Sequence, residues 1–210
     1  MAPGSGGGGG GGGTGGTEIV ALVDRSGAVV GHAERSVVRR ANLMHAATAV
    51  LVRDSERRIY VHRRSPDKDW APSRHDAAAG GVLTYGEEPA ASAARELGEE
   101  LGIVGAHLEP LGPSVYEDDT TRCVAHCFET TWGGPVRHAD GEVVWGAWMS
   151  LGELDAHLAD PGWPFVPDTR ALLARLARDG TADYGTLVTL SAAAGCRAGG
   201  GGPRRPSAPR

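Results

Sequence analysis

The sequence predicts an α/β sandwich. Short apolar runs with alternating character, bounded by turn-forming residues, indicate strands. Longer segments with helical spacing, flanked by capping residues, indicate helices. Strands and helices follow one another in a mixed order, which favours an α/β sandwich over a doubly wound parallel sheet.

The strand pattern occurs seven times along the chain. The expected strands are residues 18–24, 28–31, 45–53, 58–63, 114–117, 122–132 and 142–149. Residues 65–75 form a loop rich in turn formers, and residues 37–43 carry no clear pattern. The short apolar run 76–83 contains Gly80 and Gly81, a pair that indicates a bulge or a close approach by backbone or ligand.

Three segments are predicted to be helical. The clearest is 87–102, because Pro89 suits a first helical turn and Gly102 suits a left-handed C-cap. Ser150 and Glu153 form a capping box that opens a short helix to about residue 159. A last helix should run to residue 178 with Asp168 as its cap, and its inner face should carry Leu172, Leu173 and Leu176.

Composition bounds the domain organisation. Residues 1–16 hold 11 of the 33 glycines, so this head and the tail 199–210 are expected to be disordered. The remaining residues, 17–198, suffice for one domain.

Charge and cysteine usage narrow the classes of partner. The net charge of -5 gives no reason to expect nucleic-acid binding, and no apolar run is long enough for a membrane helix. Three cysteines without a secretory signal favour reduced thiols and a cytoplasmic location, with Cys123 and Cys127 as core residues. The expected partner is a small molecule, with the oligomeric state, a homodimer included, left open.

The segment 89–102 carries the residues with chemical potential. On a helical projection Ala90, Ala94, Leu97 and Leu101 form the expected buried face. A second arc carries Glu96, Glu99 and Glu100, at spacings where like charges repel and Arg95 offsets only part of the repulsion. Such an all-oxygen cluster favours Mg²⁺ or Mn²⁺. A solvated, glutamate-rich surface is the alternative from this helix alone.

The wider spacing carries a family resemblance. The run Gly81-x5-Glu87-x7-Arg95-Glu96-Leu97-x-Glu99-Glu100-Leu101-Gly102-Ile103 resembles the Nudix box at every defined position. The resemblance implies an α/β/α sandwich with a mixed β-sheet and an Mg²⁺- or Mn²⁺-dependent hydrolase of diphosphates. It also implies that Glu96, Glu99 and Glu100 are the metal carboxylates and that one of them also serves as a general base. Arg95 would orient these carboxylates and Glu87 would brace the loop. Gly81 would leave room for the metal or offer its carbonyl. Glu142 is a further candidate base or ligand.

Two further stretches, 18–45 and 60–81, are similar to isopentenyl-diphosphate isomerases and the related YfcD-like group of Nudix hydrolases. The isomerase needs a cysteine in the segment leading to its box, and residues 73–80 contain none. His45 and His75 are expected to be structural or solvent-facing rather than ligands. The favoured function is therefore cleavage of a diphosphate linkage in a small organic diphosphate by an activated water.

Residues before the box are expected to hold the substrate. Arg63, Arg64 and Lys68 would contact phosphate oxygens, while Trp70 and Tyr85 would flank the pocket. Two alternatives remain open at this point: an isomerase acting on isopentenyl diphosphate, and a non-catalytic Nudix domain that senses a nucleotide.

Overall fold

The computed structural model describes residues 18–138 and 141–190. Three predictions lie outside the described residues: the disorder of residues 1–16 and 199–210, the outer limits of the domain 17–198, and the state of Cys196. The elements in chain order are β1 (Ile19–Val23), β2 (Val29–Glu34), α1 (Arg35–Ala41), β3 (Met44–Arg53), β4 (Ile59–Arg64), β5 (His75–Asp76), β6 (Ala78–Ala79), α2 (Pro89–Leu101), β7 (Glu109–Glu117), β8 (Arg122–Thr131), β9 (Val143–Met149), α3 (Leu151–Leu158), α4 (Pro167–Arg178) and the 3-10 turn η1 (Tyr184–Thr186).

The β-sheet is mixed and is organised around β3. This strand runs parallel to β8 along its whole length and antiparallel to β1 and β6. Strand β4 meets β3 only at its end and pairs along its length with β9. Because β3 and β4 diverge, the short strands β5 and β6 fit beside them. The predicted mixed sheet is confirmed.

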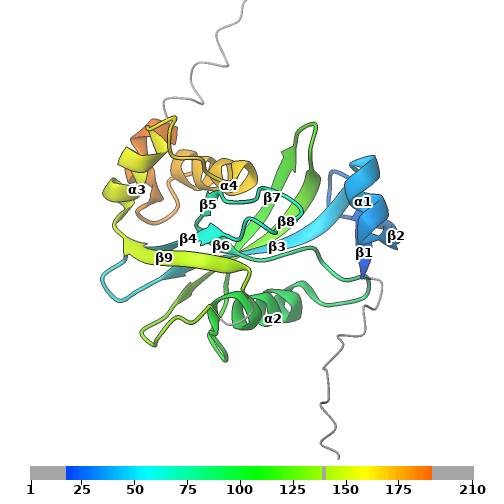
Figure 1. Cartoon of the computed structure of the whole chain (residues 1–210), viewed down its shortest axis with the longest axis horizontal. Coiled ribbons are helices and arrows are strands. Elements are labelled where there is room, and N and C mark those ends of the chain that lie inside the picture. Colours follow the sequence, from blue (N-terminus) through cyan, green and yellow to red (C-terminus); the bar gives the residue numbers. More distant parts are fainter. Residues whose placement is uncertain (1–17, 139–140, 191–210) are drawn as a thin grey trace, which may run out of the picture.

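Helices cover both faces of the sheet (Figure 1), with α2 on one side and α3 and α4 on the other. Alternation along β3 explains the two layers, since Val50 and Val52 pack in the α2 cluster and Leu51 packs in the cluster with α3 and α4. Leu172, Leu173 and Leu176 of α4 are buried as predicted. The α/β sandwich expected from the sequence is confirmed.

Two local predictions need correction or completion. Residues 37–43 mostly belong to α1, a short helix that buries Val38 and ends at Asn42 in the left-handed conformation. Asp168 does not cap α4: the N-cap is Val166, which makes no side-chain cap bond, and Pro167 begins the helix. The helix begins one residue earlier than predicted because proline is favoured at the first helical position. The capping box of Ser150 and Glu153 is present at α3.

Within residues 18–138 and 141–190, no helix has the length and apolar character that crossing a membrane requires.

Candidate active site

Helix α2 presents the glutamate-rich segment to the sheet. Pro89 stands in its first turn and Gly102 ends it at φ 66°, as predicted from the sequence. The cap places the backbone N–H of Gly102 on the carbonyl of Gly98 at 3.0 Å. These local signals fix the length of the helix and therefore the position of the glutamates near its C-terminal end.

The buried face of α2 differs from the helical projection. Ala90 and Ala94 are exposed, whereas Ala93, Leu97 and Leu101 are buried. Glu100, expected on the charged face, is only 1% exposed. Ala93, Leu97 and Leu101 pack in the core, and Glu100 turns inward beside them, where it contacts Lys68 and the backbone N–H of Gly80.

Arg95 organises the outer carboxylates. Its guanidinium lies 2.8 Å from Glu96 and 2.9 Å from Glu99, and its Nε is 3.1 Å from Glu87. The pKa of Arg95 is raised, chiefly by the hydrogen bond with Glu87. Arg95 thus bridges the loop before α2 to two carboxylates, which is the bracing arrangement that the Nudix resemblance implied for Glu87 and Arg95.

Lys68 organises the inner carboxylates. Its Nζ lies 3.2 Å from Glu100 and also contacts Glu142, which precedes β9. Burial raises the pKa of Glu100 to about 7, while the charge of Lys68 acts in the opposite direction. The structure therefore brings Glu142, a residue distant in sequence, next to the glutamates of α2.

The glycine pair permits a close approach between the loop and α2. The backbone N–H of Gly80 donates to Glu100 at 3.2 Å. A Cβ on Gly81 would come within 2.8 Å of the Glu96 carboxylate, and one on Gly80 would collide with the backbone carbonyl of Thr48. The absence of a side chain at Gly81 therefore leaves space directly in front of Glu96, and its absence at Gly80 lets the loop pack against β3.

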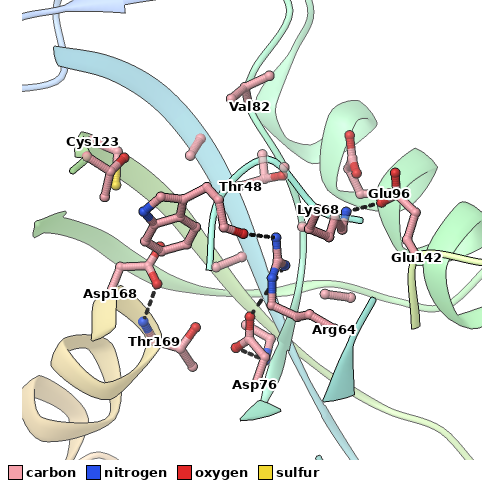
Figure 2. Close-up of a pocket in the computed structure, with 18 of the residues that line it drawn as sticks. Thr48, Arg64, Lys68, Asp76, Val82, Glu96, Cys123, Glu142, Asp168 and Thr169 are labelled. Carbon is pink, nitrogen blue, oxygen red and sulfur yellow. Dashed lines mark hydrogen bonds and ion pairs between the residues drawn. The ribbon is translucent and has the colours of Figure 1, made fainter. Parts of the chain in front are cut away.

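A cavity of about 330 Å³ opens beside these groups (Figure 2). Glu96, Glu99, Glu142, Arg95 and Gly81 line its glutamate end. The cations that line it include Arg64 and Lys68, and Trp70 lies along its wall. This arrangement places cationic groups and acidic groups around one space.

Two predicted substrate-binding residues lie outside the cavity. Arg63 is exposed on β4 and donates to the carbonyl of Ser73, because neighbouring residues of a strand point to opposite faces and Arg64 takes the inward one. Tyr85 is 49% exposed and its ring contacts that of His32. Neither is among the cavity-lining residues, so the structure does not bring these two side chains to the cavity.

The cavity also has residues that the sequence did not single out. Asp76 and Thr48 lie on its wall, and Thr169 stands at the start of α4. Asp168, expected only as a cap, lines the cavity, as does Cys123, expected only as a core residue. Both cysteines of β8 are buried and free. Burial raises the pKa of the Cys123 thiol, which keeps it protonated at neutral pH.

His45, which also lines the cavity, and His75 both make contacts within the protein. His45 is buried, its Nδ1 pairs with the carbonyl of Leu43 at 2.9 Å, and burial lowers its pKa to about 4. His75 stacks on Trp163 with ring centroids 4.2 Å apart.

The donor set fits a hard divalent cation in its chemistry. Glu96, Glu99 and Glu100 offer only oxygen, and the missing side chain at Gly81 leaves room before Glu96. In the arrangement described, Arg95 and Lys68 pair with these carboxylates. Across residues 18–138 and 141–190, no three acidic, histidine or cysteine side chains are grouped closely enough to hold a metal ion. A bound cation would therefore compete with Arg95 and Lys68 for these carboxylates.

Comparison with known protein families decides the identity of the fold. The model of the NUDIX domain matches residues 43–170, which run from just before β3 into the first turn of α4. The chain belongs to the Nudix family. The Nudix hydrolase orf19 of Rhodococcus erythropolis is 46% identical over 167 residues, covering 75% of this chain and 90% of the relative. The Nudix hydrolase YfcD of Escherichia coli K12 is 35% identical over 158 residues, covering 75% and 86%. This chain is accordingly a Nudix hydrolase, related to the YfcD-like proteins.

Solved structures agree on the fold of this Nudix hydrolase. DR0079 from Deinococcus radiodurans superposes with a TM-score of 0.60 at 23% identity, covering 70% of this chain and 92% of that one. The MutT protein of Methanosarcina mazei gives 0.56 at 21% identity, covering 66% and 96%. The Nudix-type sandwich is thus confirmed.

Proposed function

We propose that this Nudix hydrolase cleaves the diphosphate linkage of a small organic diphosphate by water attack on phosphorus, with Mg²⁺ or Mn²⁺ as cofactor. The observation that carries the proposal is the convergence on one cavity of Glu96, Glu99 and Glu142 with Arg64 and Lys68. Carboxylates suit a cation and a base, while guanidinium and ammonium groups suit phosphate oxygens.

Glu96, Glu99 and Glu100 would hold the metal, with the space or the carbonyl at Gly81 beside them. When bound, the cation would neutralise phosphate charge and lower the pKa of an attacking water. Arg95 keeps Glu96 and Glu99 in place through its ion pairs. It acts as a positioning residue in this proposal.

Glu142 is the proposed base, because it reaches the cavity from the residue before β9 and not from α2. Lys68 contacts both Glu142 and Glu100, so it holds these carboxylates before substrate arrives. Substrate phosphates offer Lys68 alternative partners, and Arg64 lines the same wall. Both cations would stabilise the negative charge that develops on the departing phosphate.

The isomerase alternative requires a thiol acid beside the metal carboxylates. The loop 73–80 has none, and Cys123 reaches the cavity from β8. A sensor would bind its nucleotide without catalysing a reaction, whereas this chain contains a full set of Nudix-box carboxylates. Hydrolysis therefore accounts for more of the residues around the cavity.

A phosphate-release screen of the full chain tests the proposal. The panel contains nucleoside diphosphates and triphosphates, ADP-ribose, dinucleotide cofactors and isopentenyl diphosphate, each with Mg²⁺, Mn²⁺ or EDTA. The proposal predicts metal-dependent release from at least one compound. Conversion of isopentenyl diphosphate to its isomer without phosphate release would favour the isomerase, and binding without any turnover would favour the sensor.

A further inference from the structure

Lys68 is the one lysine among the 21 lysine and arginine residues of the sequence. An ammonium is a compact point charge on a flexible stem, whereas a guanidinium is a rigid, planar fork that pairs with carboxylates through two hydrogen bonds. The charge of an ammonium can therefore move between partners more easily than that of a guanidinium. This chain carries its one ammonium side chain at the glutamate end of the cavity.

The Nζ atom of Lys68 contacts carboxylates from two separate segments. It lies 3.2 Å from Glu100 Oε1 on α2, and it contacts Glu142, which precedes β9 (Figure 2). The Lys68 side chain is 12% exposed and that of Glu100 is 1% exposed. The second oxygen of Glu100, Oε2, accepts from the backbone N–H of Gly80 at 3.2 Å. Both oxygens of Glu100 thus have partners within the protein, and the charge of the ammonium opposes a metal ion at Oε1.

The outer carboxylates are held in a different way. Arg95 contacts Glu96 through Oε1 and Glu99 through Oε2, so one oxygen of each carboxylate lies outside these ion pairs. The Nε of Arg95 is also anchored by Glu87 at 3.1 Å. Competition with a metal ion therefore falls more on Lys68 than on Arg95.

The loop that carries Lys68 is fastened on both sides of this residue. Before it, the backbone N–H of Ser65 donates to the carbonyl of Glu142 at 2.7 Å. After it, Asp69 pairs with Arg35 at 3.1 Å. The ammonium can therefore change partners by rotation of its flexible stem while the loop stays in place.

Lys68 requires a new anion when it leaves Glu100, because a largely buried ammonium without a partner costs free energy. The diphosphate of the substrate supplies that anion in the cavity, where Lys68 and Arg64 both line the wall. We propose that Lys68 holds the place of the metal ion in the free enzyme, and that it exchanges Glu100 for a substrate phosphate when the metal ion binds. The inference rests on the proposed function for the metal ligands and for the location of the diphosphate.

This exchange couples the binding of the two ligands. The metal ion alone has to displace Lys68 from its carboxylates, whereas the metal ion together with a diphosphate leaves Lys68 paired. The enzyme should therefore bind the metal ion weakly alone and more tightly in the presence of the diphosphate, and Lys68 should account for part of that difference.

Calorimetric titration of the full chain with Mn²⁺, without substrate, tests the first half of the inference. Lys68→Met removes the ammonium and keeps an unbranched side chain, so the Kd for Mn²⁺ should fall on the order of tenfold. Lys68→Arg retains the charge, and its Kd should stay within about threefold of the wild-type value.

Arg63→Met is the matched control, since it removes a cation from an exposed position outside the cavity. It should change the Kd for Mn²⁺ by about twofold or less. An unchanged or higher Kd in Lys68→Met, or an equal fall in Arg63→Met, would overturn the inference.

The coupling is measured with methylenediphosphonate, a diphosphate mimic whose carbon bridge resists hydrolysis. The Kd for Mn²⁺ is determined with and without this compound, after correction for the complex that the two form without protein. The ratio of the two Kd values should be about tenfold smaller in Lys68→Met than in the wild type. Equal ratios in the two proteins would contradict the exchange.

The single lysine also permits a test in the unaltered protein, which does not depend on the folding of a variant. Labelling with ¹⁵N-lysine gives one side-chain ammonium resonance, that of Lys68. Mg²⁺ with methylenediphosphonate should shift this resonance, because the partners of the ammonium change from carboxylates to a phosphonate. A resonance that stays in place while calorimetry records binding of the diphosphonate would overturn the inference.

The exchange and the hydrolysis fail separately. Coupled binding that depends on Lys68, in a protein that releases no phosphate from any compound, would support the exchange and contradict hydrolysis. Metal-dependent phosphate release with an unchanged Kd for Mn²⁺ in Lys68→Met would support hydrolysis and contradict the exchange.

Discussion

Gly81→Ala isolates the space in front of Glu96 from the stability of the fold. The new Cβ would lie 2.8 Å from Glu96 Oε1 and 2.9 Å from Oε2. Since carbon atoms pack at about 3.5 Å or more, the carboxylate would have to withdraw by roughly 0.7 Å. The atoms that must move are the far end of a flexible side chain, so the backbone can stay in place. A displacement of this size at a catalytic group costs on the order of tenfold to a hundredfold in kcat/KM.

The assay for Gly81→Ala combines phosphate release with urea unfolding. We expect the loss in kcat/KM with a change in unfolding free energy of about 1 kcal/mol or less. Gly98→Ala is the control on the same helix, because its Cβ would meet nothing closer than 3.7 Å. That change should stabilise α2 by about 0.5–1 kcal/mol and leave turnover unchanged. Wild-type turnover in Gly81→Ala, or a loss of stability that accounts for the lost activity, would refute the reasoning.

Three further predictions concern Arg64, the pH dependence of stability and the capping box of α3. Arg64→Ala should raise KM about tenfold or more, and it should destabilise the protein because Asp76 loses its nearby cation. Arg63→Ala, at a residue outside the cavity, should leave KM unchanged. Steady-state kinetics of the two variants test both expectations. The pKa values of Asp168 and Glu100 in the folded protein, both about 7, exceed their ordinary values. The folded state therefore binds more protons than the unfolded state, and stability falls as the pH rises through these pKa values. The metal-free protein should lose about 1–2 kcal/mol of stability between pH 6.5 and 8. Asp168→Asn should remove about half of that loss in urea unfolding, and an unchanged pH slope would contradict the assignment. Ser150→Ala should cost about 1 kcal/mol by breaking the capping box of α3, measured as a lower Tm, with no effect on kcat.

Features set by neighbouring residues could be predicted from the sequence. Pro89, Gly102 and the Ser150–Glu153 box define helix ends through contacts within a turn, and the structure has them where expected. The short helix α1 was not predicted because its N-cap, Glu34, makes no side-chain cap bond, and no acidic residue occupies its first turn. Its burial of Val38 depends on tertiary packing, which local sequence does not reveal.

The glutamate end of the cavity could be predicted, but the opposite end could not. Spacing within one helix brings Glu96, Glu99 and Arg95 together, whereas Cys123 reaches the cavity only because β8 pairs in parallel with β3, opposite His45. Asp168 reaches the same cavity from α4, about 120 residues after Thr48 in the sequence. Arg63 and Arg64 are chemically equivalent neighbours, so the sequence could not say which one faces inward. The inward rotation of Glu100 depends on Gly80 and Lys68, both outside the helix.

The roles given to the glutamates, Glu142 and the metal remain predictions, and hydrolysis in ¹⁸O-labelled water tests them most directly. Wild type and Glu100→Gln would each be incubated with the panel of diphosphates, with Mg²⁺ or EDTA, and the phosphate products analysed by mass spectrometry. The account predicts Mg²⁺-dependent products that carry the label on phosphorus, with turnover reduced about a hundredfold or more in Glu100→Gln. Label absent from the phosphate products, or turnover that survives both EDTA and Glu100→Gln, would contradict it.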